Sequence, residues 1–212
     1  MHIAVDWAGD PGFKSGALSY CAMAVVVSDA AEEIDVALQD VRTRRHMRKA
    51  FEFKFARINE PGKIAFMERI AQTSFTGVVV IYDKNAMDPP WAWGKNDALL
   101  AQLLMRALLQ LPRAAIENAK MIIDGDAEAK KLGGMVRPLL SRDVAARGID
   151  YRIAKIVSGD SKAHATLQLA DMIGGAAVDA WERGGRDTPL LRQVRGKVTI
   201  DVITPDMEKP AT

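Results

Sequence analysis

Short runs rich in apolar and β-branched residues predict a series of strands along the chain. They cover residues 3–5, 18–27, 77–82, 119–123, 151–157 and 198–203. The run 77–82 is apolar without a break, which is typical of a strand buried on both faces. The first two strands are separated by a segment that begins with the turn residues 9–12, so we expect them to form a hairpin.

Stretches with helical periodicity lie between these strands and predict helices at residues 28–41, 61–73, 96–111, 127–147 and 161–182. The stretch 96–111 is apolar nearly all round, which predicts the most enclosed helix. We expect the helix 127–147 to be interrupted near Gly133 and Gly134. Residues 51–55 alternate apolar and charged, which predicts a strand or an extended segment.

Two early strands followed by alternating helices and strands predict an α/β fold, with a mixed sheet flanked by helices. We find no internal repeat, and we expect one domain over residues 1–205 and a flexible polar tail over 206–212. The length of 212 residues and the 49% hydrophobic content fit a single well-formed core.

Charge and composition narrow the range of functions. The net charge of +2 is far below the strong basicity of a dedicated nucleic-acid binder. No apolar run is long enough to cross a bilayer, and the chain does not open on a secretory leader. Cys21 is the only cysteine and cannot form an internal disulfide, so we expect a cytoplasmic protein with no membrane contact.

Two acidic residues follow predicted strands, Asp6 after residues 3–5 and Asp124 after 119–123. Ligands gather beyond the carboxyl ends of parallel strands, and two carboxylates there repel unless a proton or a cation lies between them. Magnesium suits such a group of oxygen ligands. The alternative is that the segments 124–126 and 10–12 are turns whose aspartates make local hydrogen bonds.

Two further acidic positions are ambiguous from spacing alone. Glu52 lies between Phe51 and Phe53 and would point away from the core if both phenylalanines face it, or it is simply an exposed residue. The predicted helix 161–182 carries a polar stripe. The stripe either contacts something polar or is a solvent-exposed face that Asp179 and Glu182 continue. The stripe consists of His164, Gln168, Asp171 and Gly175.

Four segments, in this order, resemble the family catalogued as domain of unknown function 3800. The opening Asp6-Trp7-Ala8-Gly9-Asp10 resembles the family's Asp-Glu-Ser-Gly-Asp, and Glu52-Phe53-Lys54 its Glu-Leu/Phe-Lys. Ile122-Ile123-Asp124 resembles its strand-ending acid. Asp160-Ser161-Lys162, followed by Leu167-Gln168-Leu169-Ala170-Asp171, resembles its late block. The resemblance runs from about residue 3 to residue 177.

The resemblance implies an RNase H-like fold with an acidic cluster of Asp6, Glu52, Asp124 and Asp171 as catalytic residues. Asp6, Asp124 and Asp171 would bind Mg²⁺ or Mn²⁺, typically as a pair of ions, with Asp10 and Gln168 as outer members. The sequence departs from the family where Trp7 replaces a glutamate. A glutamate that pointed into the site would be a lost metal ligand, and one that pointed away would be unimportant.

Several basic and aromatic residues are candidates for substrate binding. Lys54 or Lys162 would neutralise a phosphate, and His164 would handle protons or product, although each also fits a surface or structural role. A basic run suits phosphate contacts, or it completes a helix end. It consists of Arg42, Arg44, Arg45, His46, Arg48 and Lys49. Trp91 and Trp93 would stack on bases or anchor their loop.

The sequence therefore predicts a divalent-metal-dependent nuclease or phosphodiesterase acting on nucleic acid, without separating RNA from DNA. One alternative is an inactive RNase H-like module that binds nucleic acid or a protein partner. Another is a metal-dependent enzyme acting on a small phosphorylated molecule, which suits the modest net charge.

Overall fold

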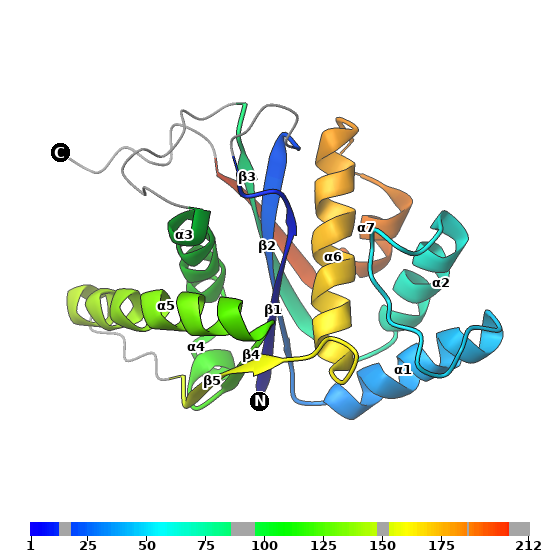
Figure 1. The fold of residues 1–212 in the computed structure, drawn as a ribbon, viewed down its shortest axis with the longest axis horizontal. Coiled ribbons are helices and arrows are strands. Elements are labelled where there is room, and N and C mark those ends of the chain that lie inside the picture. The colour runs from blue at the N-terminus through cyan, green and yellow to red at the C-terminus, as the bar shows by residue number, and fades with distance from the viewer. Residues whose placement is uncertain (13–17, 86–95, 148–152, 186, 204–212) are drawn as a thin grey trace.

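The computed structural model describes residues 1–12, 18–85, 96–147, 153–185 and 187–203, and these form a mixed six-stranded sheet (Figure 1). The strand order is β5-β4-β1-β2-β3-β6. β1 pairs antiparallel with β2, and β2 with β3, whereas the pairs β1–β4, β4–β5 and β3–β6 are parallel. The predicted hairpin and the predicted mixed sheet are both confirmed. The strands are β1 His2–Gly9, β2 Tyr20–Ser28, β3 Thr76–Asp83, β4 Lys120–Asp124, β5 Lys155–Gly159 and β6 Val198–Ile203.

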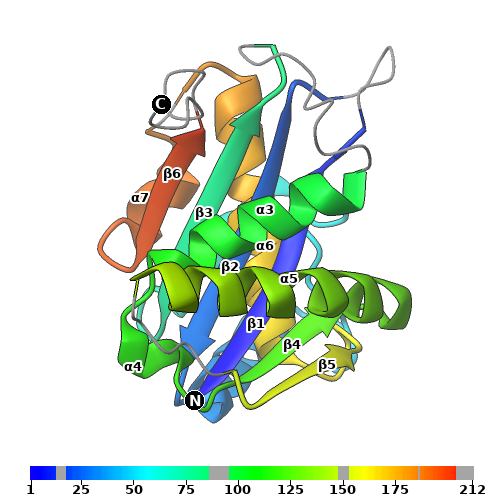
Figure 2. The ribbon, with the colours of Figure 1, turned by 90° about the vertical axis from the view of Figure 1, so that its left-hand side faces the viewer.

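Helices cover both faces of the sheet, as Figure 1 and the turned view in Figure 2 show. One face carries α3 (Asn96–Leu109), α4 (Arg113–Ile116) and α5 (Asp126–Arg147). The other carries α1 (Ala31–Arg44), α2 (Glu60–Ile70), α6 (Ala165–Glu182) and α7 (Pro189–Val194). Alternate strand residues enter the two cores, so Ile3 and Val5 face α3 while Ala22 and Ala24 face α6.

α6 lies close against β1 and β2 because small residues meet at the contact. A Cβ added to Gly174 would lie 3.2 Å from the Cβ of Ala24 and 3.5 Å from that of Ala8. Most of the helix is buried, including its polar residue Gln168, which is 1% exposed. Its packing therefore fixes the polar residues of α6 beside β1.

The structure differs from the sequence-based expectation in several places. α5 continues through Gly133 and Gly134, because Gly133 lies against Ile156 of β5 and serves close packing, not a break. Of the two alternatives for residues 51–55, the strand does not form: the segment lies outside the sheet. The predicted helix 161–182 begins only at Ala165, after a turn. The short helices α4 and α7 were not predicted, although Thr188 caps α7 and Pro189 opens it.

No helix among the described residues is both long enough and apolar enough to span a bilayer. The predicted tail 206–212 and the tryptophans Trp91 and Trp93 lie outside the described residues.

Candidate functional site

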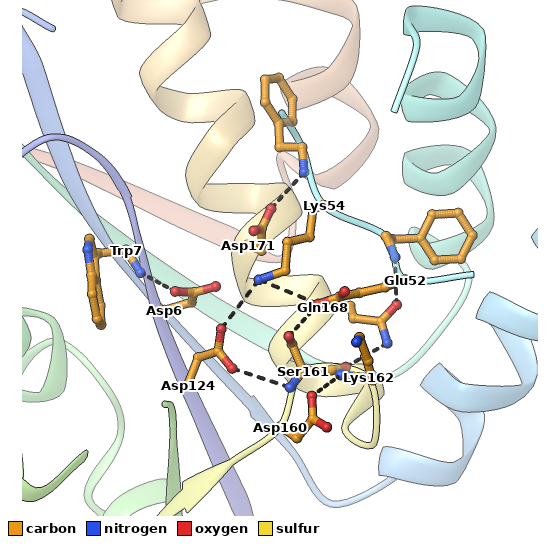
Figure 3. Close-up of polar contacts among 12 residues, drawn as sticks. Asp6, Trp7, Glu52, Lys54, Asp124, Asp160, Ser161, Lys162, Gln168 and Asp171 are labelled. Atoms are coloured by element: carbon orange, nitrogen blue, oxygen red, sulfur yellow. Dashed lines mark hydrogen bonds and ion pairs between the residues drawn. The ribbon is translucent and has the colours of Figure 1, made fainter. Parts of the chain in front are cut away.

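The parallel pairing of β1 with β4 brings two aspartates to the same edge of the sheet. Val5 pairs with Ile123, so Asp6 lies next to the end of β4, where Asp124 is the last residue. Asp6 itself does not end its strand as predicted, because β1 continues to Gly9 through its pairing with β2. β4 ends there because Gly125 adopts a φ of 82°, which glycine tolerates without strain. The side chain of Asp6 is only 7% exposed and points toward the other acidic residues in Figure 3.

The polar stripe of α6 binds residues 51–55, which we call the acidic-site segment. The Phe53 amide donates to Oε1 of Gln168 at 2.9 Å, and the Phe55 amide donates to Oδ1 of Asp171 at 2.7 Å. One turn further on, Gly175 leaves room for the Phe55 ring, which a Cβ would overlap. The stripe is therefore a binding surface for another part of the chain and is not a solvated face.

Glu52 reaches the site because the phenylalanines on either side of it point elsewhere. Phe51 and Phe53 pack edge to face, 5.3 Å apart, in the core beneath α6. The Glu52 carboxylate accepts a hydrogen bond from the Ser161 hydroxyl at 2.6 Å, and the Ser161 amide donates to Oδ1 of Asp124 at 3.3 Å. Ser161 thus ties the acidic-site segment to the end of β4.

One lysine lies among the four carboxylates (Figure 3). Nζ of Lys54 is 3.4 Å from Oε1 of Glu52 and 3.5 Å from Oδ2 of Asp124, and its side chain is 27% exposed. Burial alone would lower the pKa of Lys54, but the four surrounding carboxylates outweigh it and raise that pKa. The group, which we call the carboxylate cluster, contains Asp6, Glu52, Asp124 and Asp171, so four acids face one ammonium.

Two acids of the carboxylate cluster have raised pKa values. Burial is the main cause that raises the pKa of Asp6, to about 8, and the charges of Asp171 and Asp124 add to it. Burial also raises the pKa of Asp171, against the opposing effects of the Phe55 amide and Lys54. A buried carboxylate with a strongly raised pKa is typical of a functional site.

The donor set suits a divalent cation that prefers oxygen ligands. Oδ1 of Asp6 accepts from the Trp7 amide at 2.8 Å, whereas its buried Oδ2 has no described partner. As the side chains stand, however, no three acidic, histidine or cysteine residues in the described part of the chain are close enough to hold an ion. Lys54 lies between two of the carboxylates, so an ion would have to displace it.

Gln168 links the acidic-site segment to the turn before α6 by hydrogen bonds. Its Nε2 donates to the carbonyl of Ser161 at 2.7 Å, while its Oε1 accepts from the Phe53 amide and, at 3.3 Å, from the Arg42 guanidinium. Arg42 also donates to the Phe51 carbonyl and is only 6% exposed, so it is a structural residue rather than part of a phosphate-binding run. The sequence predicted a role for Gln168 but none for Ser161, whose hydroxyl contact becomes visible only in the fold.

The remaining candidates lie around the site or away from it. Asp10 accepts from the Gly12 amide in a local turn, and its described contacts do not include the carboxylate cluster. His164 is the N-cap residue of α6, and Lys162 is exposed beside the site on the turn before that helix. At the end of α1, Arg44 binds Asp40 in a salt bridge of 2.8 Å, and Arg45 and Arg48 are exposed.

Trp7 points away from the carboxylate cluster. It follows Asp6 on β1, so its side chain takes the opposite face and packs against the core beneath α3 and α5. Figure 3 shows its indole directed away from the acidic residues. A glutamate at this position would not face the cluster, so the departure from the family pattern removes no ligand here.

Comparisons with known proteins bear on the fold. No family model matches the chain, and no curated protein matches it. Among solved structures, the chain is similar to one described as the PCNA:RNase HII complex from Archaeoglobus fulgidus, with a TM-score of 0.56. The match covers 92% of this chain and 87% of the other at 12% identity. The fold is therefore RNase H-like, as predicted, and a likeness at this identity establishes the fold alone.

Proposed function

We propose that this chain is a divalent-metal-dependent nuclease or related phosphodiesterase of the family catalogued as domain of unknown function 3800. The observation that carries the proposal is the convergence of four carboxylates from four separate segments on one lysine. Asp6 comes from β1, Asp124 from β4 and Asp171 from α6, while Glu52 comes from the acidic-site segment. Part of the proposal is a cytoplasmic setting, which suits a chain whose one cysteine is buried and free.

Asp6, Asp124 and Asp171 would hold Mg²⁺ or Mn²⁺, with Glu52 beside them. A bound ion would supply an activated water at neutral pH and stabilise the charge on the leaving oxygen. Side chains of this chain would orient the acids and contact the substrate. Ser161 and Gln168 orient Glu52 by direct and indirect hydrogen bonds. With an ion held by the carboxylates, the Lys54 ammonium would be free to contact a substrate phosphate. Lys162, Arg44, Arg45 and Arg48 would add phosphate contacts outside the cluster.

The first experiment is a cleavage assay on single- and double-stranded DNA and RNA and on an RNA–DNA hybrid. Each substrate is incubated with Mg²⁺, Mn²⁺ or chelator, and Asp6→Asn is compared with the parent protein. Asp35→Asn on the exposed surface of α1 is the matched control. Metal-dependent cutting that disappears only in Asp6→Asn supports the nuclease. Absence of cutting by folded, metal-binding protein argues against it.

A second candidate is an inactive RNase H-like module that binds nucleic acid or a protein partner without turnover. The position of Lys54 favours it, because an ammonium already neutralises part of the cluster and the described residues hold no ready-made ion site. Metal titration separates the two functions, since the inactive module should bind Mg²⁺ or Mn²⁺ poorly. An enzyme on a small phosphorylated molecule would bind metal but show no salt-dependent binding of polynucleotide.

A further inference from the structure

The face of the sheet that carries the carboxylate cluster also carries a row of basic residues. β1, β4 and β5 are parallel and in register at their first residues, so His2 pairs with Lys120, and Lys120 pairs with Lys155. Residues that pair in this way point to the same face of a sheet. We call these three residues the basic row, and Figure 2 shows the starts of their strands side by side at the lower end of the sheet.

The basic row and the acids share a face because side chains alternate along the strands. Two residues after the basic row, Ala4 pairs with Ile122, and both pack against Leu167 of α6. Two residues further, Asp6 and Asp124 belong to the carboxylate cluster on this same face. A strand rises by about 3.3 Å per residue, so the basic row lies roughly 13 Å from the acids along the strands.

α6 leaves the basic row uncovered. The helix begins at Ala165, and its first turn packs against the neighbouring row through Leu167. His2, Lys120 and Lys155 are all exposed as a result. Among the described residues, neither lysine forms a salt bridge or a side-chain hydrogen bond. Their two ammonium groups are therefore available to an external anion.

The surroundings of His2 are positively charged. Burial is the main cause that lowers the pKa of His2, and the charges of Lys120 and His164 lower it further. No acid of the described chain is among the charges that act on this histidine. Such a surface attracts anions, and a polyanion gains most because it makes several contacts at once.

Two more basic residues connect the basic row with the carboxylate cluster. The turn between β5 and α6 carries His164 and Lys162, and a Cβ added to Gly159 would lie 3.0 Å from the His164 ring. Lys162 is exposed beside the cluster (Figure 3). The acid of this turn, Asp160, accepts a hydrogen bond from the Lys162 amide at 3.0 Å. Basic side chains therefore continue from the row to Lys54.

From these observations we propose that the basic row binds the phosphate backbone of a polynucleotide strand whose scissile phosphate lies at the carboxylate cluster. This inference rests on the proposed function and deepens it, because it selects a polynucleotide over a small phosphorylated molecule. At about 3.4 Å for each nucleotide of one strand, roughly four nucleotides span the distance from the row to the acids. A shorter substrate reaches the cluster without touching the row.

The test is a fluorescence anisotropy titration of labelled single-stranded DNA and RNA, each of about twelve nucleotides, over a range of salt concentrations. Chelator is present so that nothing is cut. The variant combines Lys120→Gln with Lys155→Gln, two exposed positions. Each lost phosphate contact lowers the slope of log K against log salt by about 0.7 for a single strand, so the slope should fall by about 1.4 and the affinity at low salt by roughly tenfold.

The control removes the same charge from the opposite face of the sheet. It combines Lys130→Gln with Arg137→Gln, both at exposed positions of α5, and should keep the slope and the affinity of the parent. Equal salt slopes in the basic-row variant and the parent would overturn the proposal. So would a parent protein that binds neither polynucleotide at low salt.

Cleavage in Mg²⁺ connects the row with the site. The basic-row variant should cut the long strand at least threefold more slowly at subsaturating concentration, and should cut a dinucleotide at the rate of the parent. Equal slowing on both lengths would contradict the distance between row and acids. A parent that neither cuts nor binds Mg²⁺ in calorimetry, yet binds polynucleotide through the row, would overturn the proposed function and leave the basic row as a binding surface.

Discussion

Nζ of Lys54 lies 3.5 Å from Oδ2 of Asp124, so the acidic-site segment and the end of β4 are joined by an ion pair within the carboxylate cluster. A divalent ion that binds these carboxylates must compete with the ammonium. We expect Lys54→Met to raise the affinity for Mg²⁺ or Mn²⁺ by about tenfold, ~1.4 kcal/mol, and to lower metal-dependent cleavage because the phosphate contact is lost. Metal titration followed by calorimetry measures the first effect independently of activity.

The control for this variant is Lys162→Met, which removes an exposed lysine from the neighbouring turn and should leave the metal affinity unchanged. In chelator, Lys54→Met should also unfold at a lower denaturant concentration, since the ionised acids of the cluster then face one another without a cation. Equal metal affinity in Lys54→Met and the parent would mean that the ion does not take the place of the ammonium.

The raised pKa of Asp6 predicts a pH-dependent stability. In the folded protein this pKa is about 8, against 3.8 for an unperturbed group, so between those values the folded state holds a proton that the unfolded state has lost. Stability is therefore fully present below pH ~4 and falls as the pH rises through about 8. Asp6→Asn removes this loss and should be more stable than the parent at pH 9, by on the order of a few kcal/mol.

Denaturant unfolding at pH 5, 7 and 9 in chelator measures this effect. Asp171 contributes in the same direction because its pKa is also raised, so some slope should persist in Asp6→Asn. The exposed control Asp35→Asn should keep the full slope of the parent. A parent protein as stable at pH 9 as at pH 5 would show that Asp6 is ionised without penalty.

Gln168 should be essential for fixing the acidic-site segment. Gln168→Leu keeps the volume but leaves the Phe53 amide, the Ser161 carbonyl and the Arg42 guanidinium short of a partner. Burying such groups unpaired costs about 1–3 kcal/mol each, so we expect a loss of stability on the order of 3 kcal/mol after relaxation. Gln72→Leu, at an exposed position, should change stability by less than about 0.5 kcal/mol. A neutral Gln168→Leu would mean that the segment is held by its phenylalanines alone.

Sequence patterns predicted the sheet well because most of its strands are nearly continuous apolar runs. Asp6 and Asp124 were found for the same reason, since each ends such a run. The segment around Glu52 was predicted less well because its backbone amides bond to side chains of α6, 115 and 116 residues away in sequence, instead of to a neighbouring strand. Neither the Ser161 contact with Glu52 nor the position of Lys54 between two carboxylates has a local signal, because both depend on how distant segments meet.

Gly175 is predicted to be required because any side chain at this position would clash with Phe55. A Cβ there would overlap the Phe55 ring. The ring cannot move away easily, because Lys63 contacts it and the Phe55 amide donates a hydrogen bond to Asp171. Gly175→Ala should therefore lower the free energy of unfolding by about 1–3 kcal/mol, as overpacking does. The matched control is Gly134→Ala in α5, where nothing lies within 4 Å of the added methyl. That change should stabilise the protein by up to about 1 kcal/mol through helix propensity. Thermal or denaturant unfolding compares the two, and equal effects would contradict the contact.

Trp7→Glu restores the residue type typical of the family that the sequence resembles, yet we expect no gain in metal affinity. The side chain at this position faces α3 and α5, on the opposite side of β1 from the carboxylate cluster. A glutamate there replaces an aromatic ring that packs against a hydrophobic core, so the variant should be less stable by about 2–3 kcal/mol. Trp7→Phe keeps most of the apolar contact and should lose less. Metal titration of Trp7→Glu decides the matter: an affinity higher than that of the parent would show that position 7 reaches the site after all.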